Sequence, residues 1–229
     1  MFSLDSVGFL LIGEEFHFFH YLLSEVANYF YLLLVLTFLT YFKVLDKKYF
    51  IFWAVYFSSP FFTTYVMFDE HFMGDQGIYL ATVNNNIIYG VGSVAEISNG
   101  ISGLLTQKVQ VASNFMSMIP MVSYLSVTSL AFINKLIVLI FFIFMKSRIS
   151  LDKLIYFFLI PSFILFSSVG LRDTLIMSFT SIALILIIER KIILSLVTLI
   201  LASLIKTQLG PGLIIVWLLM FILRADKYF

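Results

Sequence analysis

Two cationic side chains stand beside helix breakers in otherwise apolar sequence. Arg172 is followed at once by Asp173 in SSVGLRDTLIMS (167–178), and Lys206 opens KTQLGPG (206–212). An arginine binds phosphate through its planar fork of donors, and a nearby lysine adds a point charge. Within a membrane such charges cost about 2.5–3.5 kcal/mol each on insertion scales, so they usually serve a function. The two motifs therefore predict a site for a phosphate-bearing anion.

Both cations also have a structural interpretation. Arg172 could donate to carbonyl groups of the turn that Gly170 permits, whereas an Arg172–Asp173 ion pair is disfavoured because adjacent helical residues do not face each other. Lys206 could complement the negative end of the preceding helix or extend to the headgroups. Asp173 is expected to open the next helix, where its carboxylate accepts backbone N–H groups. At this point both interpretations stay open.

A second group of reactive side chains lies in FDEHFMGDQGIYLATVNNNIIYG (68–90), the most polar stretch of the chain. The carboxylates of Asp69, Glu70 and Asp75 could act as general bases toward a sugar hydroxyl. Tyr79 offers a flat face on which a sugar could stack. The same residues would also suit a solvated loop with interfacial aromatic rings. Because the acidic spacing follows no metal-loop pattern, we expect no metal and no cofactor.

The composition places these residues in a membrane protein. Of the 229 residues, 61% are hydrophobic and 12% are charged. These are too few polar residues to cover the exterior of a soluble domain. The net charge of +1 gives no basis for nucleic acid binding, and the absence of Cys excludes disulfides and cysteine–metal sites. Apolar runs with little alternation favour helices over a β-barrel. We expect an all-α, polytopic bundle that forms one membrane domain, residues 1–229.

About seven apolar segments are predicted to span the membrane. They cover residues 26–42, 49–68, 126–145, 154–169, 174–189, 192–205 and 211–223. The basic residues cluster after alternate segments, at Lys43, Lys47, Lys48, Lys146, Arg148, Lys153, Arg190, Lys191, Arg224 and Lys227. By the positive-inside rule these loops and the C-terminus face the cytoplasm. The N-terminus and residues 69–114 then face outward, the latter as a loop with an amphipathic or re-entrant piece.

The last four segments are short for membrane spans. They have roughly 13 to 16 residues and so rise about 20–24 Å, whereas a hydrocarbon core is about 30 Å thick. Because basic residues fix their inner ends, their outer ends should stop below the outer surface. We therefore expect a water-filled cavity there, with Arg172 and Lys206 in its floor. Lys135, inside the third segment, is expected to pair with an acidic group or to line this cavity.

The C-terminal half resembles a known family. The stretch from SSVGLRDTLIMSF through IERKIILSLVTLILASLIKTQLGPGLIIV is similar to bacterial polysaccharide polymerases of the O-antigen and exopolysaccharide (Wzy or EpsG-like) type. In those proteins a Gly-x-Arg-acidic step opens a helix, a basic pair and another helix follow, and a polar residue closes that helix. GDQGIY (74–79) looks like their acidic-plus-tyrosine stretch. The chain departs in having fewer spans and Lys206 in place of histidine, as expected of a truncated or reduced polymerase.

The resemblance implies a glycosyltransferase of surface-polysaccharide biosynthesis in the bacterial inner membrane. It would join oligosaccharide repeat units carried on polyprenyl pyrophosphate at the periplasmic face, with the N-terminus periplasmic. Its partners would be lipid-linked glycans, membrane lipids and other membrane proteins of polysaccharide assembly. The residues assigned on this hypothesis are the catalytic Arg172, Asp75, Asp69 and Glu70 and the substrate-binding Lys206, Asp173, Tyr79 and Gln208.

Two other functions fit the same residues. A non-enzymatic subunit or a transporter component would use the cavity to bind an anionic lipid or substrate, and interrupted helices are typical of transporter sites. The sequence has no inverted repeat, which counts against a transporter. A glycosyltransferase that uses a polyprenyl-phosphate sugar predicts an acidic pair on the first outer loop, which Asp69 and Glu70 supply. Whether the chain is an enzyme stays open at this point.

Overall fold

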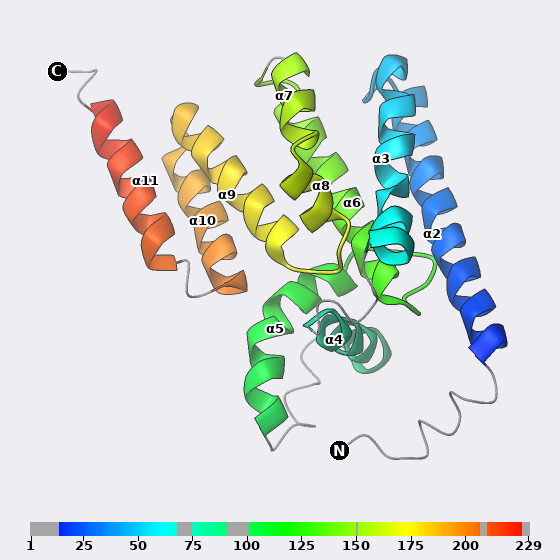
Figure 1. Cartoon of the computed structure of the whole chain (residues 1–229). Coiled ribbons are helices and arrows are strands. Elements are labelled where there is room, and N and C mark those ends of the chain that lie inside the picture. The colour runs from blue at the N-terminus through cyan, green and yellow to red at the C-terminus, as the bar shows by residue number, and fades with distance from the viewer. Residues whose placement is uncertain (1–13, 68–74, 91–100, 150, 207–209, 226–229) are drawn as a thin grey trace.

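The structure is a computed structural model that describes residues 14–67, 75–90, 101–149, 151–206 and 210–225 (Figure 1). These residues form helices joined by short connections, and none of the described residues lies in a β-strand. The predicted all-helical class is therefore confirmed.

The helices follow the apolar segments of the sequence. In chain order they are α2 (Glu14–Tyr41), η1 (Lys47–Tyr49), α3 (Phe50–Phe62), the π-helical η2 (Thr63–Met67), α4 (Asp75–Tyr89), α5 (Ile101–Ser117), α6 (Val127–Met145), α7 (Leu151–Phe158), α8 (Pro161–Ser167), α9 (Asp173–Ile188), α10 (Ile192–Ile205) and α11 (Gly210–Ala225). The outward segment contains two helices: α4, where a loop was expected, and α5, which overlaps the expected amphipathic piece.

Among the described residues, three helical stretches are long and apolar enough to cross a membrane. They are Tyr21–Tyr41, Lys47–Met67 and Val127–Met145. The helices α9 and α10 are apolar but shorter, as the sequence predicts. Length and composition therefore indicate a membrane protein, whereas a bundle of seven spans stays a prediction.

The fourth predicted span, residues 154–169, is two short helices rather than one. α7 ends at Phe158, and α8 begins at Pro161, whose fixed φ and missing N–H suit the first position of a helix. α8 ends in turn at Ser167, and a short turn leads to α9. Each interruption leaves backbone groups that need partners from other helices if the segment lies in a membrane.

The connections sort to two ends of the bundle. The α2–α3, α6–α7 and α9–α10 connections and the C-terminal end of α11 lie at one end, at the top of Figure 1. The α8–α9 turn and the C-terminal end of α10 lie toward the other end, where α4 runs across the bundle. The connections predicted to be cytoplasmic thus lie together, although their orientation in a membrane stays a prediction.

Two of the connections at that end contain, as their second residue, a basic residue in the left-handed backbone conformation. Lys43 after α2 has φ 59°, and Arg190 after α9 has φ 65°. In each case the next residue donates its amide to a carbonyl five residues earlier, at 2.9 Å and 2.8 Å, which is the Schellman pattern. Glycine adopts this conformation at lower cost, so the positive charges are kept here against the backbone preference.

Among the described residues, two apolar clusters hold most of the helices together. The first joins α2, α3, α6, α7 and α8 around the buried Trp53, whose ring centroid lies 5.0 Å from that of Phe142 and 5.8 Å from that of Phe158. The second joins α4, α5, α6, α9 and the last residue of α10, and it includes two residues of the α8–α9 turn. That turn is therefore anchored in the core.

Candidate functional site

The N-terminal end of α9 meets the C-terminal end of α10. Lys206 Nζ lies 3.6 Å from Asp173 Oδ1, and Arg172 Nη1 donates to the carbonyl of Ile205 at 3.4 Å. The side chains of Lys206 and Asp173 are 31% and 33% exposed. The structure thus brings together two cations that come from separate motifs, and it leaves them accessible.

These contacts also correspond to the structural interpretation of both cations. Arg172 donates to a carbonyl, although the carbonyl belongs to α10 and not to its own turn. Lys206 follows the last residue of α10, where a cation opposes the negative helix end, and Asp173 lies in the first turn of α9, where an anion is favoured. The site therefore has a stable resting arrangement before any ligand binds.

The turn between α8 and α9 is held by buried side chains of two other helices. Asn134 of α6 donates through Nδ2 to the carbonyls of Val169 and Leu171, at 2.7 Å and 2.9 Å. Gln76 of α4 accepts the amide of Gly170 through Oε1, at 2.7 Å. The backbone groups that the helix interruption leaves open thus receive partners, and the residue before α9 is fixed in place.

Gly170 lets this turn lie directly against α6. A Cβ atom at this position would come 2.8 Å from the Cβ of Leu130 and 3.0 Å from the carbonyl oxygen of Val127. Glycine is therefore required by the lack of space and not by its backbone angles.

A buried lysine lies beside the same turn. Lys135 of α6 is fully buried, and its Nζ donates to Ser167 Oγ at 2.8 Å and to Ser168 Oγ at 2.7 Å. Both hydroxyls donate in turn to the carbonyl of Ile164, so their oxygens are left to accept. The third direction of the amine faces the Tyr56 ring, whose centroid is 4.0 Å away. Three neutral partners thus match the three donors of an ammonium group.

Of the two sequence-based alternatives for Lys135, pairing with an acidic group is wrong for the described residues. The contacts are with hydroxyls and an aromatic ring, and not with an acidic group. The serines also connect to α3, because Ser59 Oγ lies 2.7 Å from Ser168 Oγ and Thr63 donates to the Ser168 carbonyl at 3.0 Å. The adjacent serines at the end of an apolar segment were the sequence signal that could have indicated this site.

The acidic residues predicted from the outward segment are described only in part. Asp75 is the first residue of α4 and precedes Gln76, which bonds to the α8–α9 turn, so the start of α4 lies beside that turn. The side chain of Asp75 lies outside the described part of the structure, as do Asp69, Glu70 and Gln208 entirely. Their predicted roles stay predictions.

Tyr79 packs α4 against the bundle. Its side chain is 1% exposed and belongs to the second apolar cluster. In this conformation protein atoms cover the ring, so it presents no open face to a sugar. Asn86, in the same helix, bonds to α5 instead: its Nδ2 donates to Asn114 Oδ1 at 2.9 Å, and Gln110 donates to both amides. These two residues of α4 therefore serve packing between helices.

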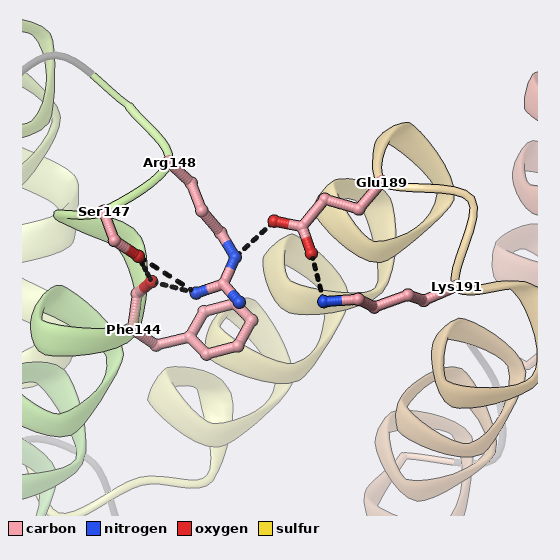
Figure 2. A network of polar contacts seen from close by, with 5 residues as sticks. All are labelled: Phe144, Ser147, Arg148, Glu189 and Lys191. Atoms are coloured by element: carbon pink, nitrogen blue, oxygen red, sulfur yellow. Dashed lines mark hydrogen bonds and ion pairs between the residues drawn. The ribbon is translucent and has the colours of Figure 1, made fainter.

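The opposite end of the bundle carries a different charged network (Figure 2). Glu189 accepts hydrogen bonds from Arg148 and, at 2.9 Å, from Lys191, and the Arg148 guanidinium lies 3.7 Å from the centroid of the Phe144 ring. The hydrogen bonds from Lys191 and then Arg148 lower the pKa of Glu189 below its ordinary value. This network joins the C-terminal end of α6 to the α9–α10 connection.

No family model, curated protein or solved structure matches this chain. The resemblance to polysaccharide polymerases therefore depends on the quoted motifs alone. Among the described residues there is no cluster of three or more His, Asp and Glu side chains that could hold a metal ion.

Proposed function

We propose that this chain is a bacterial inner-membrane protein that polymerises oligosaccharide repeat units carried on polyprenyl pyrophosphate. The observation that carries the proposal is the meeting of Arg172 and Lys206 at the joined ends of α9 and α10, where Arg172 donates to the Ile205 carbonyl and Lys206 lies beside the Asp173 carboxylate. The motifs that resemble polymerases supply these same two residues.

The charges suit the leaving group of this reaction. The acceptor hydroxyl oxygen attacks the anomeric carbon of the growing chain, and the bond from that carbon to the pyrophosphate oxygen breaks. The pyrophosphate takes the electron pair, and its added negative charge is stabilised by the Arg172 guanidinium and the Lys206 ammonium. In the resting state Ile205 and Asp173 occupy these cations, and the pyrophosphate would replace them.

The start of α4 supplies the acceptor side of the site. Asp75 is assigned as the base that takes the proton of the acceptor hydroxyl. Its helix is fixed to the turn before Arg172 by the bond from the Gly170 amide to Gln76. The base and the leaving-group cations thus belong to segments that are in contact.

The charge distribution supports the periplasmic placement. The connections rich in lysine and arginine lie at one end of the bundle, and the ends of α9 and α10 that carry Arg172 and Lys206 lie toward the other (Figure 1). With the basic end in the cytoplasm, the site faces outward.

The test is Arg172→Ala in a strain that depends on this protein for its surface polysaccharide. Polysaccharide chains should become shorter on a gel, while immunoblots of the membrane fraction show normal protein amounts. Lys47→Ala is the matched control, because Lys47 is an exposed cation at the opposite end of the bundle. Chains of normal length in a stably inserted Arg172→Ala protein would refute the proposed role.

A second candidate is a non-enzymatic subunit that binds the same lipid-linked glycan. The resting contacts of Arg172 and Lys206 favour it, because both cations already have partners without any reaction. The two candidates differ in a reconstituted assay. Purified protein in liposomes with a lipid-linked repeat unit elongates the glycan only if it is the polymerase itself.

A further inference from the structure

An apolar groove runs along α9 between α5 and α6. Its volume is about 330 Å³, and its walls include Phe115 of α5, Ile140 and Phe141 of α6 and Phe179 of α9. The rings of Phe115 and Phe179 meet with centroids 5.7 Å apart. The polar contribution to this lining from the described residues is the side chain of Ser178. We call this feature the α9 groove.

The groove shares a helix face with Arg172. The groove residues Leu175, Phe179 and Ile182 follow Arg172 by three, seven and ten positions, which is the spacing of one helix face. Leu175 and Ile182 are separated by about 10 Å along the axis. A ligand with an anionic head at Arg172 could therefore continue directly into the groove with an apolar tail.

Ser178 keeps the groove open. It is the smallest side chain of the lining, it is buried, and its hydroxyl has no hydrogen-bond partner among the described residues. A larger apolar residue here would fill the space and remove the unpaired hydroxyl, so close packing alone does not explain the serine. Its small size indicates that the space itself is used.

We propose that the α9 groove holds the first isoprene units of a polyprenyl phosphate lipid whose phosphate lies at Arg172. The inference rests on the proposed function and adds the place of the lipid tail. The volume lies at the low end of the roughly 300–1,000 Å³ range of ligand pockets. It has room for one branched chain, whereas a phospholipid would bring two chains to the same cation.

The experiment measures binding of a radiolabelled long-chain polyprenyl phosphate to the purified full chain in detergent. Ser178→Leu fills the groove, and the lost apolar contact, equivalent to about two methylene groups, should weaken binding about tenfold. Ser178→Ala removes the hydroxyl without filling the space, and it should bind like the wild type. Equal affinity of the Ser178→Leu protein and the wild type would overturn the inference.

A second variant that fills the groove keeps the inference testable if Ser178→Leu does not fold. Ile140 lines the groove and is 58% exposed, so Ile140→Trp fills the groove from its outer side without changing the core. It should weaken binding as Ser178→Leu does, with a thermal unfolding temperature close to that of the wild type. Normal affinity in a folded Ile140→Trp protein would also overturn the inference.

Two further ligands test whether the groove recognises the isoprenoid tail independently of the phosphate head, and whether it prefers that tail to a phospholipid. An uncharged polyprenol should bind the wild type and Arg172→Gln alike and should bind Ser178→Leu about tenfold more weakly. Phosphatidylglycerol should not displace the polyprenyl phosphate, and displacement at equal concentration would refute the assignment to an isoprenoid chain.

The same measurements distinguish failure of this inference from failure of the proposed function. Binding that needs Arg172 but survives Ser178→Leu would refute the groove and leave the function standing. Polyprenol binding that Ser178→Leu weakens would support the groove even where Arg172→Ala leaves polysaccharide chain length normal.

Discussion

Gln76 and Gly170 are 94 residues apart in sequence, yet the Gly170 amide donates to Gln76 Oε1 at 2.7 Å in a buried contact. This bond joins α4 to the turn that precedes α9. Because Asp75 and Arg172 are each within two residues of the bond, it fixes the two halves of the candidate site relative to each other. The sequence does not predict this contact, because one partner is a backbone amide, which every residue except proline carries.

Replacing Gln76 by leucine should destabilise the protein. The substitution leaves the buried Gly170 amide without an acceptor, which costs about 1–3 kcal/mol. Thermal unfolding in detergent measures the loss. Asn85→Leu makes a similar change at a partly exposed position of the same helix and should shift stability by less than about 0.5 kcal/mol. Equal unfolding temperatures for Gln76→Leu and the wild type would show that the bond contributes nothing.

Two glycines should respond in opposite directions to alanine. Gly170→Ala forces a methyl group to within 2.8 Å of Leu130 Cβ, so stability should fall by about 1–3 kcal/mol. Gly77 lies inside α4 with no atom within 4 Å of an added Cβ, so Gly77→Ala should raise stability by about 0.5–1 kcal/mol. Denaturation curves of the two variants test the pair, and unchanged or raised stability of Gly170→Ala would contradict the packing of the turn against α6.

The meeting of α9 and α10 followed from sequence because two apolar segments of similar length, joined by a basic turn, must run back along each other. Arg172 and Lys206 mark the far ends of those segments, so their proximity was predictable. The α10–α11 turn motif at 206–212 gave no information on partners, and the Lys206–Asp173 contact was found only in the structure.

The helix α4 of the outward segment was missed for a different reason. Its glycine and asparagine content predicts a loop, but its buried side chains, Gln76, Tyr79, Val83 and Asn86, recur at helical spacing. Because two of these four residues are polar, a search for apolar residues at helical spacing does not detect this buried face. The partner of Lys135 was missed because the search was for a carboxylate, whereas neutral oxygens and a ring supply the contacts.

Lys135→Met should leave the protein as stable as the wild type or more stable by about 1–3 kcal/mol. A buried charge without an opposite charge carries a large desolvation cost, and a methionine of similar length removes that cost without leaving a cavity. Lys135→Ala should lose about 2–5 kcal/mol, because it leaves an unfilled space. Unfolding temperatures distinguish the two variants.

The functional outcome of Lys135→Met is a separate expectation. A buried lysine kept at a cost in stability indicates a role in function, so on the proposed function polysaccharide chains should shorten although the protein folds. Destabilisation of Lys135→Met to the level of Lys135→Ala would show instead that the hydrogen bonds of the amine to Ser167 and Ser168 stabilise the fold.

Glu189 should make stability depend on pH at the basic end of the bundle. Its pKa in the folded protein is lowered from 4.5, so its contribution is present above the ordinary pKa and is lost as pH falls through the folded value. The unfolding temperature of the wild type should therefore drop more than that of Glu189→Gln below about pH 4.5. The difference should shrink in high salt, since the network is exposed. Parallel pH profiles for the two proteins would contradict these contacts.

Asp173→Asn should strengthen the binding of inorganic pyrophosphate. Asp173 lies 3.6 Å from the Lys206 amine, so removal of its charge frees that cation and reduces repulsion of an incoming anion. Exposed ion pairs of this kind contribute about 0.2–1 kcal/mol, which corresponds to an increase in affinity of up to about fivefold. Lys206→Met should change affinity in the opposite direction, and isothermal titration calorimetry on the purified protein measures both. Weaker binding in Asp173→Asn would contradict this prediction. It would mean that the Asp173 carboxylate helps to position Arg172 for the anion.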